Sequence, residues 1–224
     1  MTPWNEIWDR AVARHGEDVL REGFPHAATA DELRALSDDR YLAAISKRVF
    51  AAGFRWRVIL AKWDGFEEAF HGFDPLWVAD LDASGVETLA QDTRIVRNRI
   101  KIRSTIENAA FVLRVAAEHG SFGNWLADWP ADDTLGLWAA MKADGDRLGG
   151  NTGPWILRLV GRPTFRFSGD MVQALVEFGA IPRPPGGKKI EQQAQAAINA
   201  WSAESGLDVG AISGVLAKSV GELR

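Results

Sequence analysis

One glycine-rich stretch has the residue types of an anion-binding turn; it reads LGGNTGPWILRLVG from Leu148 to Gly161. The stretch joins two segments with helical spacing, and Pro154 suits the first turn of the second segment. Backbone N–H groups at a helix N-terminus have no partner within the helix and attract anions. We therefore predict a helix–hairpin–helix over residues 134–161 that holds a DNA phosphate through Gly149, Gly150, Asn151, Thr152, Gly153 and Arg158. An ordinary corner between two helices is the alternative.

The distribution of charge favours the same partner. The chain carries a net charge of −4 at pH 7, which by itself argues weakly against nucleic acid. However, residues 94–114 hold only Glu107 against six basic side chains, which are Arg94, Arg97, Arg99, Lys101, Arg103 and Arg114. The charged side chains of residues 158–189 are also mostly basic. Such segregation suits a surface that binds a polyanion on one side, although exposed helices are also often arginine-rich for solubility.

Helical spacing dominates the whole chain, so we predict an all-α fold of roughly ten helices. Residues 31–52 read as one helix, Gly53 ends it, and a second helical stretch reaches residue 70. Pro75 suits the first turn of the next helix, Ser84 and Glu87 suggest a capping box, and residues 105–118 form a long amphipathic helix. PRPPGG at residues 182–187 is the clearest linker, and Asp208 caps the last helix. We expect one domain over residues 1–224, in which residues 188–224 pack back on the N-terminal part.

Composition excludes several classes of protein. The chain has no cysteine, so neither a disulfide framework nor a thiolate metal site is expected. No run approaches the about 18 apolar residues of a membrane helix. The N-terminus lacks the pattern of a secretory signal. We expect a cytoplasmic, nucleoid-associated protein that is monomeric and makes no membrane contact.

Three motifs in Ala52–Ala109 carry a family resemblance: AGFRW, the F-x-x-F-D-P pattern from Phe70 to Pro75, and IVRNRIKI at Ile95–Ile102 followed by Asn108-Ala109. With them, the chain resembles the bacterial 3-methyladenine DNA glycosylase I family. The Leu148–Gly179 region looks like the helix–hairpin–helix and following loop of the wider glycosylase superfamily. The resemblance implies a two-lobed helical fold that flips a damaged nucleotide out of the duplex and stacks an aromatic ring on its base.

The resemblance also assigns roles to individual residues. Trp56 is the base-stacking candidate, with Phe54 and Trp4 as weaker ones, although an average tryptophan belongs to the core. Arg97, Arg99 and Lys101 would approach backbone phosphates. The carbonyls of the hairpin would hold a monovalent cation, K⁺ or Na⁺, and no other cofactor is implied.

The sequence departs from the family in its acidic residues and in its metal ligands. The family's pocket glutamate, eight residues before the tryptophan of AGFRW, corresponds to Arg48, which would repel a cationic purine. The superfamily's catalytic aspartate corresponds to Ser168, with Asp170 two residues later; Asp170 could serve in catalysis or could cap the helix at 171–178. Glu22 could supply the missing carboxylate or lie on a solvated face. Without cysteine, and with no ligand spacing among His15, His26, His71 and His119, we expect no zinc.

These features predict a monofunctional DNA glycosylase that binds double-stranded DNA with a damaged base and excises an alkylated purine. The alternative is a non-catalytic protein on a glycosylase scaffold that binds damaged or distorted DNA. Loss of both expected carboxylates is the argument for that alternative.

Overall fold

The computed structural model describes residues 1–221 of the 224-residue chain, and within them the fold is entirely helical. Fifteen α-helices and one 3₁₀ helix occur in this range, and none of its residues forms a strand. The all-α prediction is therefore confirmed. No helix of the described part is both long and apolar enough to cross a membrane. The chain divides into two compact units, and each is built from more than one segment of the sequence.

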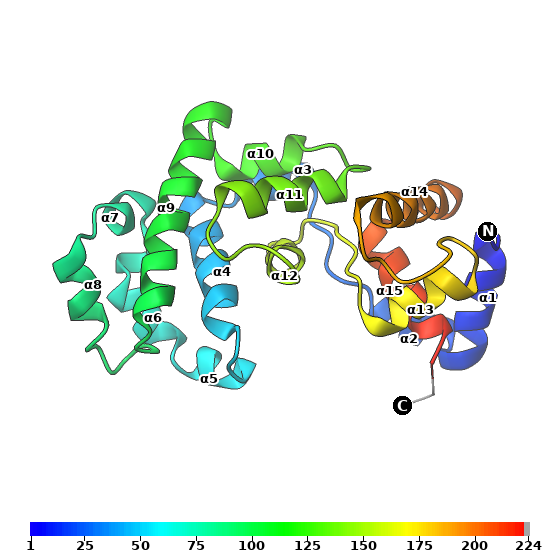
Figure 1. Ribbon diagram of the computed structural model, residues 1–224, viewed down its shortest axis with the longest axis horizontal. Helices are drawn as coiled ribbons and strands as arrows, with labels where there is room; N and C mark the ends of the chain where they lie inside the picture. The colour runs from blue at the N-terminus through cyan, green and yellow to red at the C-terminus, as the bar shows by residue number, and fades with distance from the viewer. Residues whose placement is uncertain (222–224) are drawn as a thin grey trace. The chain divides into compact units, whose positions relative to one another are not determined.

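Unit 2 comprises residues 28–129 and 138–162. Its central element is α9 (Arg99–His119), which packs against α4, α7, α8 and α10; Figure 1 shows α9 standing between α4 and the α7–α8 pair. The other elements of the unit are α3 (Ala30–Ala35), α4 (Asp38–Ala51), α5 (Trp56–Ala61), α6 (Trp63–Ala69), η1 (His71–Phe73), α7 (Pro75–Ala79), α8 (Ala83–Leu89), α10 (Phe122–Asp128), α11 (Thr134–Asp144, from residue 138 on) and α12 (Thr152–Leu159).

Aromatic rings form the core of unit 2 beside α4. Phe50 lies edge-on to Phe66 with ring centroids 4.6 Å apart, and Phe70 stacks on Phe73 at 5.3 Å. All four side chains have no exposed surface. Offset and edge-on rings of this kind add to the stabilisation that burial alone provides. The end of α4 is consequently fixed in the core up to Phe50.

Unit 1 comprises Met1–Ala27, Pro130–Leu137 and the chain from Pro163 on. Its helices are α1 (Trp4–His15), α2 (Glu17–Glu22), α13 (Gly169–Glu177), α14 (Lys188–Ser205) and α15 (Val209–Ser219). Helix α15 packs against α1, α13 and α14. Trp201 of α14 is fully buried, and its indole N–H donates to the Thr2 carbonyl at 3.0 Å. The C-terminal helices therefore lie against the N-terminal segment within this unit.

Several helix boundaries match the local signals, and others do not. Pro75 is the first residue of α7, and Asp208 caps α15 through the amides of Gly210 and Ala211. The single helix expected over residues 31–52 is wrong, because the backbone is extended at Leu36 and Ser37 between α3 and α4.

The capping box expected at Ser84 is also wrong. Asp82 caps α8 by accepting from the Gly85 amide at 2.8 Å, while the Glu87 carboxylate pairs with Arg99. Helix α9 begins at Arg99, six residues before the expected start at residue 105, because the Asn98 side chain accepts from the amides of Ile100 and Lys101. Asparagine is a favoured N-cap residue, so the earlier start has a local cause.

Candidate nucleic-acid interface

An exposed aromatic loop, defined here as residues 52–58, follows α4. Every residue of this loop is exposed; the side chains of Phe54 and Trp56 are 44% and 38% exposed. Gly53 turns the chain with φ of +79°, a conformation that residues with a Cβ rarely adopt. Arg55 and Arg57 alternate with the two rings. Trp56 is therefore not a core tryptophan, and its ring is accessible for stacking.

Lys101 of α9 contacts the backbone where this loop begins. Its side chain is buried, and its ammonium donates to the Phe50 carbonyl at 2.9 Å and to the Ala52 carbonyl. The Phe54 ring lies over the same ammonium, 4.8 Å from ring centroid to Nζ. Burial lowers the pKa of Lys101, and the nearby charge of Arg147 lowers it further. In this structure the ammonium of Lys101 faces backbone carbonyls inside the unit, whereas the sequence predicts a phosphate contact.

A glycine-rich turn joins α11 and α12 at the place where the hairpin is predicted. Gly150 has φ of +61°, and the turn closes through the amide of Thr152 to the Gly149 carbonyl at 3.2 Å and that of Gly153 to the Leu148 carbonyl at 3.0 Å. A Cβ on Gly153 would lie 3.0 Å from the Leu148 oxygen, so glycine permits this close approach. Two of the amides expected to bind phosphate thus close the turn themselves.

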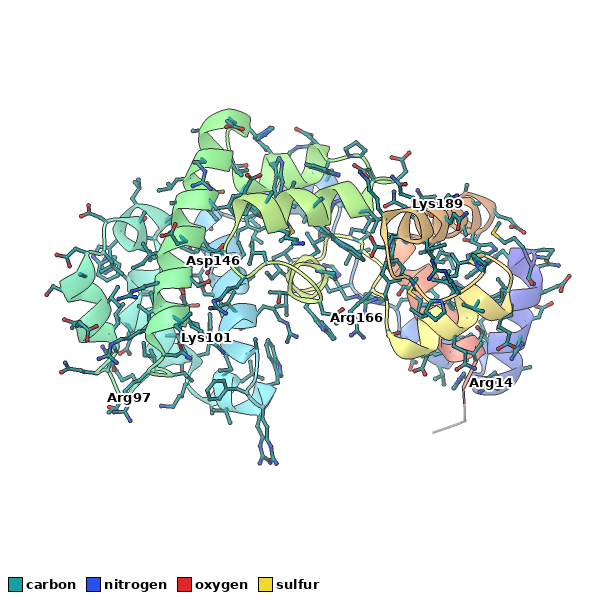
Figure 2. The ribbon with its side chains drawn as sticks, viewed as in Figure 1. Arg14, Arg97, Lys101, Asp146, Arg166 and Lys189 are labelled. Atoms are coloured by element: carbon teal, nitrogen blue, oxygen red, sulfur yellow. The ribbon has the colours of Figure 1, made fainter. Side chains whose placement is uncertain are left out.

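Helix α9 anchors the hairpin through side chains whose role the sequence did not indicate. The buried Asn108 side chain donates to the Asp146 carbonyl and accepts from the Asp146 amide, each at 3.0 Å. Ser104 donates to the same carbonyl at 3.3 Å, and Arg114 donates to the Asp144 carbonyl at 2.9 Å. Figure 2 shows Lys101 and Asp146 at two levels along α9. One helix therefore fixes both the aromatic loop and the hairpin.

The basic segment before α9 is partly neutralised. Arg99 makes a double hydrogen bond with the Glu87 carboxylate, which holds the pKa of that carboxyl below its usual range. Arg94 pairs with Asp92 and with Glu68. Arg97 is exposed. Water and salt screen an exposed ion pair, so a phosphate could displace Glu87 from Arg99 at little cost.

Two arginines flank the Trp155 ring of α12. The guanidinium of Arg48, in the last turn of α4, lies 5.3 Å from the ring centroid, and that of Arg158 lies 5.9 Å away. Both distances are within the range of cation–π attraction. The position at which the family resemblance places a carboxylate therefore carries a guanidinium held against an aromatic face.

The candidates in unit 1 have structural roles or exposed positions. Trp4 is 7% exposed and packs against Trp8, so the expectation of an accessible stacking ring is wrong there. Glu22 is exposed at the end of α2. The Ser168 hydroxyl accepts from the Met171 amide at 3.3 Å, which makes Ser168 the N-cap of α13. Asp170 is exposed in the first turn of α13, so the alternative that Asp170 caps the helix is also wrong.

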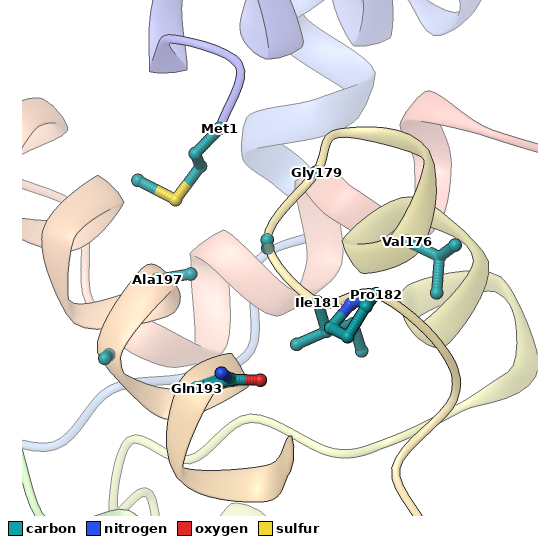
Figure 3. A pocket seen from close by; sticks show the side chains of 9 residues that line it. Met1, Val176, Gly179, Ile181, Pro182, Gln193 and Ala197 are labelled. Atoms are coloured by element: carbon teal, nitrogen blue, oxygen red, sulfur yellow. The ribbon is translucent and has the colours of Figure 1, made fainter. Parts of the chain in front are cut away.

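A hollow of about 650 Å³ opens on unit 1 (Figure 3). Its lining includes Met1, Val176, Ile181, Pro182, Gln193 and Ala197, and no side chain that lines it is charged. The side chains of this hollow therefore supply no general acid or base. Among the described residues, no group of three or more histidine, aspartate or glutamate side chains is arranged to hold a metal ion.

Comparison with known proteins identifies the class to which this arrangement belongs. The crystal structure of 3-methyladenine DNA glycosylase I from Staphylococcus aureus aligns with a TM-score of 0.52 and 21% identity, covering 62% of this chain and 80% of that one. The fold is thus that of the helical 3-methyladenine DNA glycosylases.

Sequence comparisons find the same similarity in part of the chain. Residues 34–141 match the family model for methyladenine glycosylase. DNA-3-methyladenine glycosylase 1 of Escherichia coli is 41% identical over 64 residues, which are 29% of this chain and 34% of that protein. The Haemophilus influenzae DNA-3-methyladenine glycosylase is 29% identical over 75 residues, 34% of this chain and 40% of that protein. Residues 34–141 are therefore similar to the methyladenine glycosylase family. The chain spans well under half the length of these curated relatives.

Proposed function

We propose that this protein is a monofunctional DNA glycosylase that excises an alkylated purine from double-stranded DNA. The observation that carries the proposal is the exposed pair Phe54 and Trp56, which lies within residues 34–141. Lys101 of α9 bonds to the end of α4 from which this loop starts. An aromatic ring on that loop can stack on a base taken out of the duplex. Arg97, Arg99, Arg158 and the exposed part of the hairpin, Gly150 and Asn151, would contact phosphates and contribute affinity without sequence preference.

The reaction requires little from the protein beyond positioning. In a cationic N3-methylated purine the N-glycosidic bond is already weak, and its electron pair leaves with the base, which becomes neutral. Water adds to C1′ of the sugar and loses a proton. Asp170 is our candidate for accepting that proton or for stabilising the positive sugar, because its carboxylate is exposed and not used as a helix cap. No strand cleavage is expected, and no cofactor is needed beyond a monovalent cation on the hairpin carbonyls.

A second function is favoured by a specific observation. Arg48 stands where the family resemblance places a carboxylate, and Ser168, at the position of the superfamily aspartate, caps a helix. A protein without both carboxylates would still bind damaged or distorted DNA through the same surface. Non-catalytic recognition of damaged DNA, by a monomer associated with the nucleoid, is therefore the alternative.

Base release from methylated duplex DNA under single-turnover conditions separates the two functions. We expect the wild-type protein to release 3-methyladenine or 7-methylguanine, and Trp56→Ala to abolish release. Trp77→Ala is the matched control, because Trp77 is also 38% exposed and in unit 2 but stacks on His71. Release that survives Asp170→Asn would remove Asp170 from the mechanism. No release, with DNA binding that weakens steeply with salt, would establish the second function, and no binding at low salt would contradict both.

A further inference from the structure

We propose that Lys101 is a positioning residue for base excision: its buried ammonium fixes the aromatic loop so that Phe54 and Trp56 meet the flipped base in the correct place. This inference rests on the proposed function. It gives Lys101 a role inside the protein, in place of the phosphate contact that its basic segment indicated.

The first argument is the surroundings of the ammonium. Only 9% of Lys101 is exposed, and Nζ donates to the Phe50 and Ala52 carbonyls at the C-terminal end of α4. The last carbonyls of a helix have no partner within it and carry partial negative charge. A lysine at this position therefore satisfies the orphan carbonyls and ties the start of the loop to α9.

The second argument is that the loop has little else to hold it. Residues 52–58 are all exposed, and Ile59 is the single buried residue of α5. The loop's own hydrogen bonds include those from the amides of Ala52 and Phe54 to the Val49 and Ala51 carbonyls, at 3.3 and 3.0 Å. Because so little apolar surface is buried here, the contacts of Lys101 largely determine where the loop lies.

The third argument is that Lys101 connects helix α9 to the Phe54 ring. Its own backbone amide donates to the Asn98 cap at 3.1 Å, and its carbonyl accepts from the Thr105 hydroxyl at 3.1 Å. At the other end, its charge lies 4.8 Å from the centre of the Phe54 ring. Attraction between the ammonium and the ring face favours one orientation of Phe54.

The test compares Lys101→Met with Lys62→Met in the full-length protein. Lys62 is the matched control, because its ammonium also donates to a backbone carbonyl, that of Thr93 at 2.7 Å, which lies outside the aromatic loop. We expect amide exchange at Ala52 and Phe54 to accelerate at least tenfold in K101M and to stay unchanged in K62M. Single-turnover base release should fall about 100-fold in K101M, as expected when a catalytic contact is displaced by about 1 Å.

Affinity for undamaged duplex DNA distinguishes positioning from phosphate binding. Under our proposal, K101M binds within about threefold of wild type, and the slope of log affinity against log salt is unchanged. A weaker K101M whose slope falls by about 0.9, with normal exchange and normal base release, would show that Lys101 contacts a phosphate and would overturn the proposal.

The exchange measurement also separates this inference from the proposed function. If wild-type protein releases no base but K101M still loosens the loop, positioning stands and the excision activity does not. Unchanged exchange in a folded K101M overturns the positioning role whatever the activity. If K101M does not fold, Lys101→Gln, which keeps an amide donor for one carbonyl, carries the same comparison.

Discussion

Two positive side chains of unit 2, Arg48 and Lys101, hold their charge in different surroundings. Carbonyl oxygens at the end of α4 surround the ammonium of Lys101, so its charge is used for structure. The guanidinium of Arg48 instead faces the Trp155 ring, and a second guanidinium, that of Arg158, lies against the same ring. Positive charge beside this ring opposes the approach of a cationic base.

Reversing the charge of Arg48 is expected to favour a cationic lesion. Arg48→Glu should raise the single-turnover release of 3-methyladenine at saturating protein by about tenfold or more, which corresponds to about 1.4 kcal/mol of electrostatic stabilisation. Arg183→Glu, an exposed residue of the PRPPGG linker, is the control for the same change of net charge. An R48E protein that releases the base no faster than wild type would show that Arg48 does not determine substrate charge.

At the scale of elements, α9 anchors both the aromatic loop after α4 and the loop that leads into the hairpin. Asn108 is fully buried and makes two hydrogen bonds with the backbone of Asp146, so it fixes the loop that leads into the hairpin. Asn108→Ala removes both of these partly buried hydrogen bonds, and only the Ser104 hydroxyl still donates to the Asp146 carbonyl. We expect a loss of about 2–3 kcal/mol in the free energy of unfolding.

Denaturant unfolding measures this loss, and Asn124→Ala provides the comparison. Asn124 donates to the His119 carbonyl at 3.0 Å in the same unit, but that bond is exposed to water. Its loss should cost less than about 1 kcal/mol. Equal effects of N108A and N124A would mean that the hairpin does not depend on its anchor in α9.

Tyr41 joins α4 to α3 and makes this contact sensitive to alkaline pH. It is the one tyrosine of the chain, it is 1% exposed, and its hydroxyl donates to the Leu33 carbonyl at 2.6 Å. Burial raises the pKa of Tyr41 well above its usual value, and the charge of Asp38 adds to the shift. The unfolded chain therefore releases this proton near pH 10 while the folded protein keeps it. Stability from this group is complete below about pH 10 and is lost above it.

Tyrosinate absorbance and unfolding curves test this expectation together. The absorbance of Tyr41 should not rise near pH 10 in the folded protein, but only when the protein unfolds. Tyr41→Phe should cost about 1 kcal/mol at pH 7, because it removes the hydrogen bond, yet lose less stability than wild type between about pH 10 and 11. If Tyr41 ionises near pH 10 while the protein stays folded, its hydroxyl is not buried as in this structure.

These elements also show which features a sequence can predict. Pro75, Asp208 and Gly53 act on their own neighbours, so the start of α7, the cap of α15 and the end of α4 follow from local residue types. Apolar spacing continues through Leu36 and Ser37, so it concealed the break between α3 and α4.

At the candidate site, the aromatic residues followed from a motif, but the supporting contacts did not. Lys101 lies 51 residues from Phe50, and Asn108 lies 38 residues from Asp146. No periodicity or spacing rule connects positions so far apart. A basic residue in a basic segment indicated phosphate binding, whereas burial assigns Lys101 to the backbone of α4.

At the scale of the whole molecule, the two units differ in how the chain forms them. Unit 1 takes three separate segments of the sequence, whereas unit 2 is nearly continuous, since only residues 130–137 interrupt it. The aromatic core around Phe50, the anchors on α9 and the hairpin all lie within residues 28–162. A compact segment with its own core can fold alone.

We therefore expect a fragment of residues 28–162 to fold independently and to keep the aromatic loop in place. Circular dichroism should show a helical spectrum with a cooperative thermal transition, and amide exchange at Ala52 and Phe54 should match that of the full chain. The fragment should bind DNA, because it carries Arg97, Arg158 and the hairpin, but it lacks Asp170 and should release no base under the proposed mechanism. Base release by the fragment would exclude Asp170, while a fragment that does not fold would show that unit 2 depends on the rest of the chain.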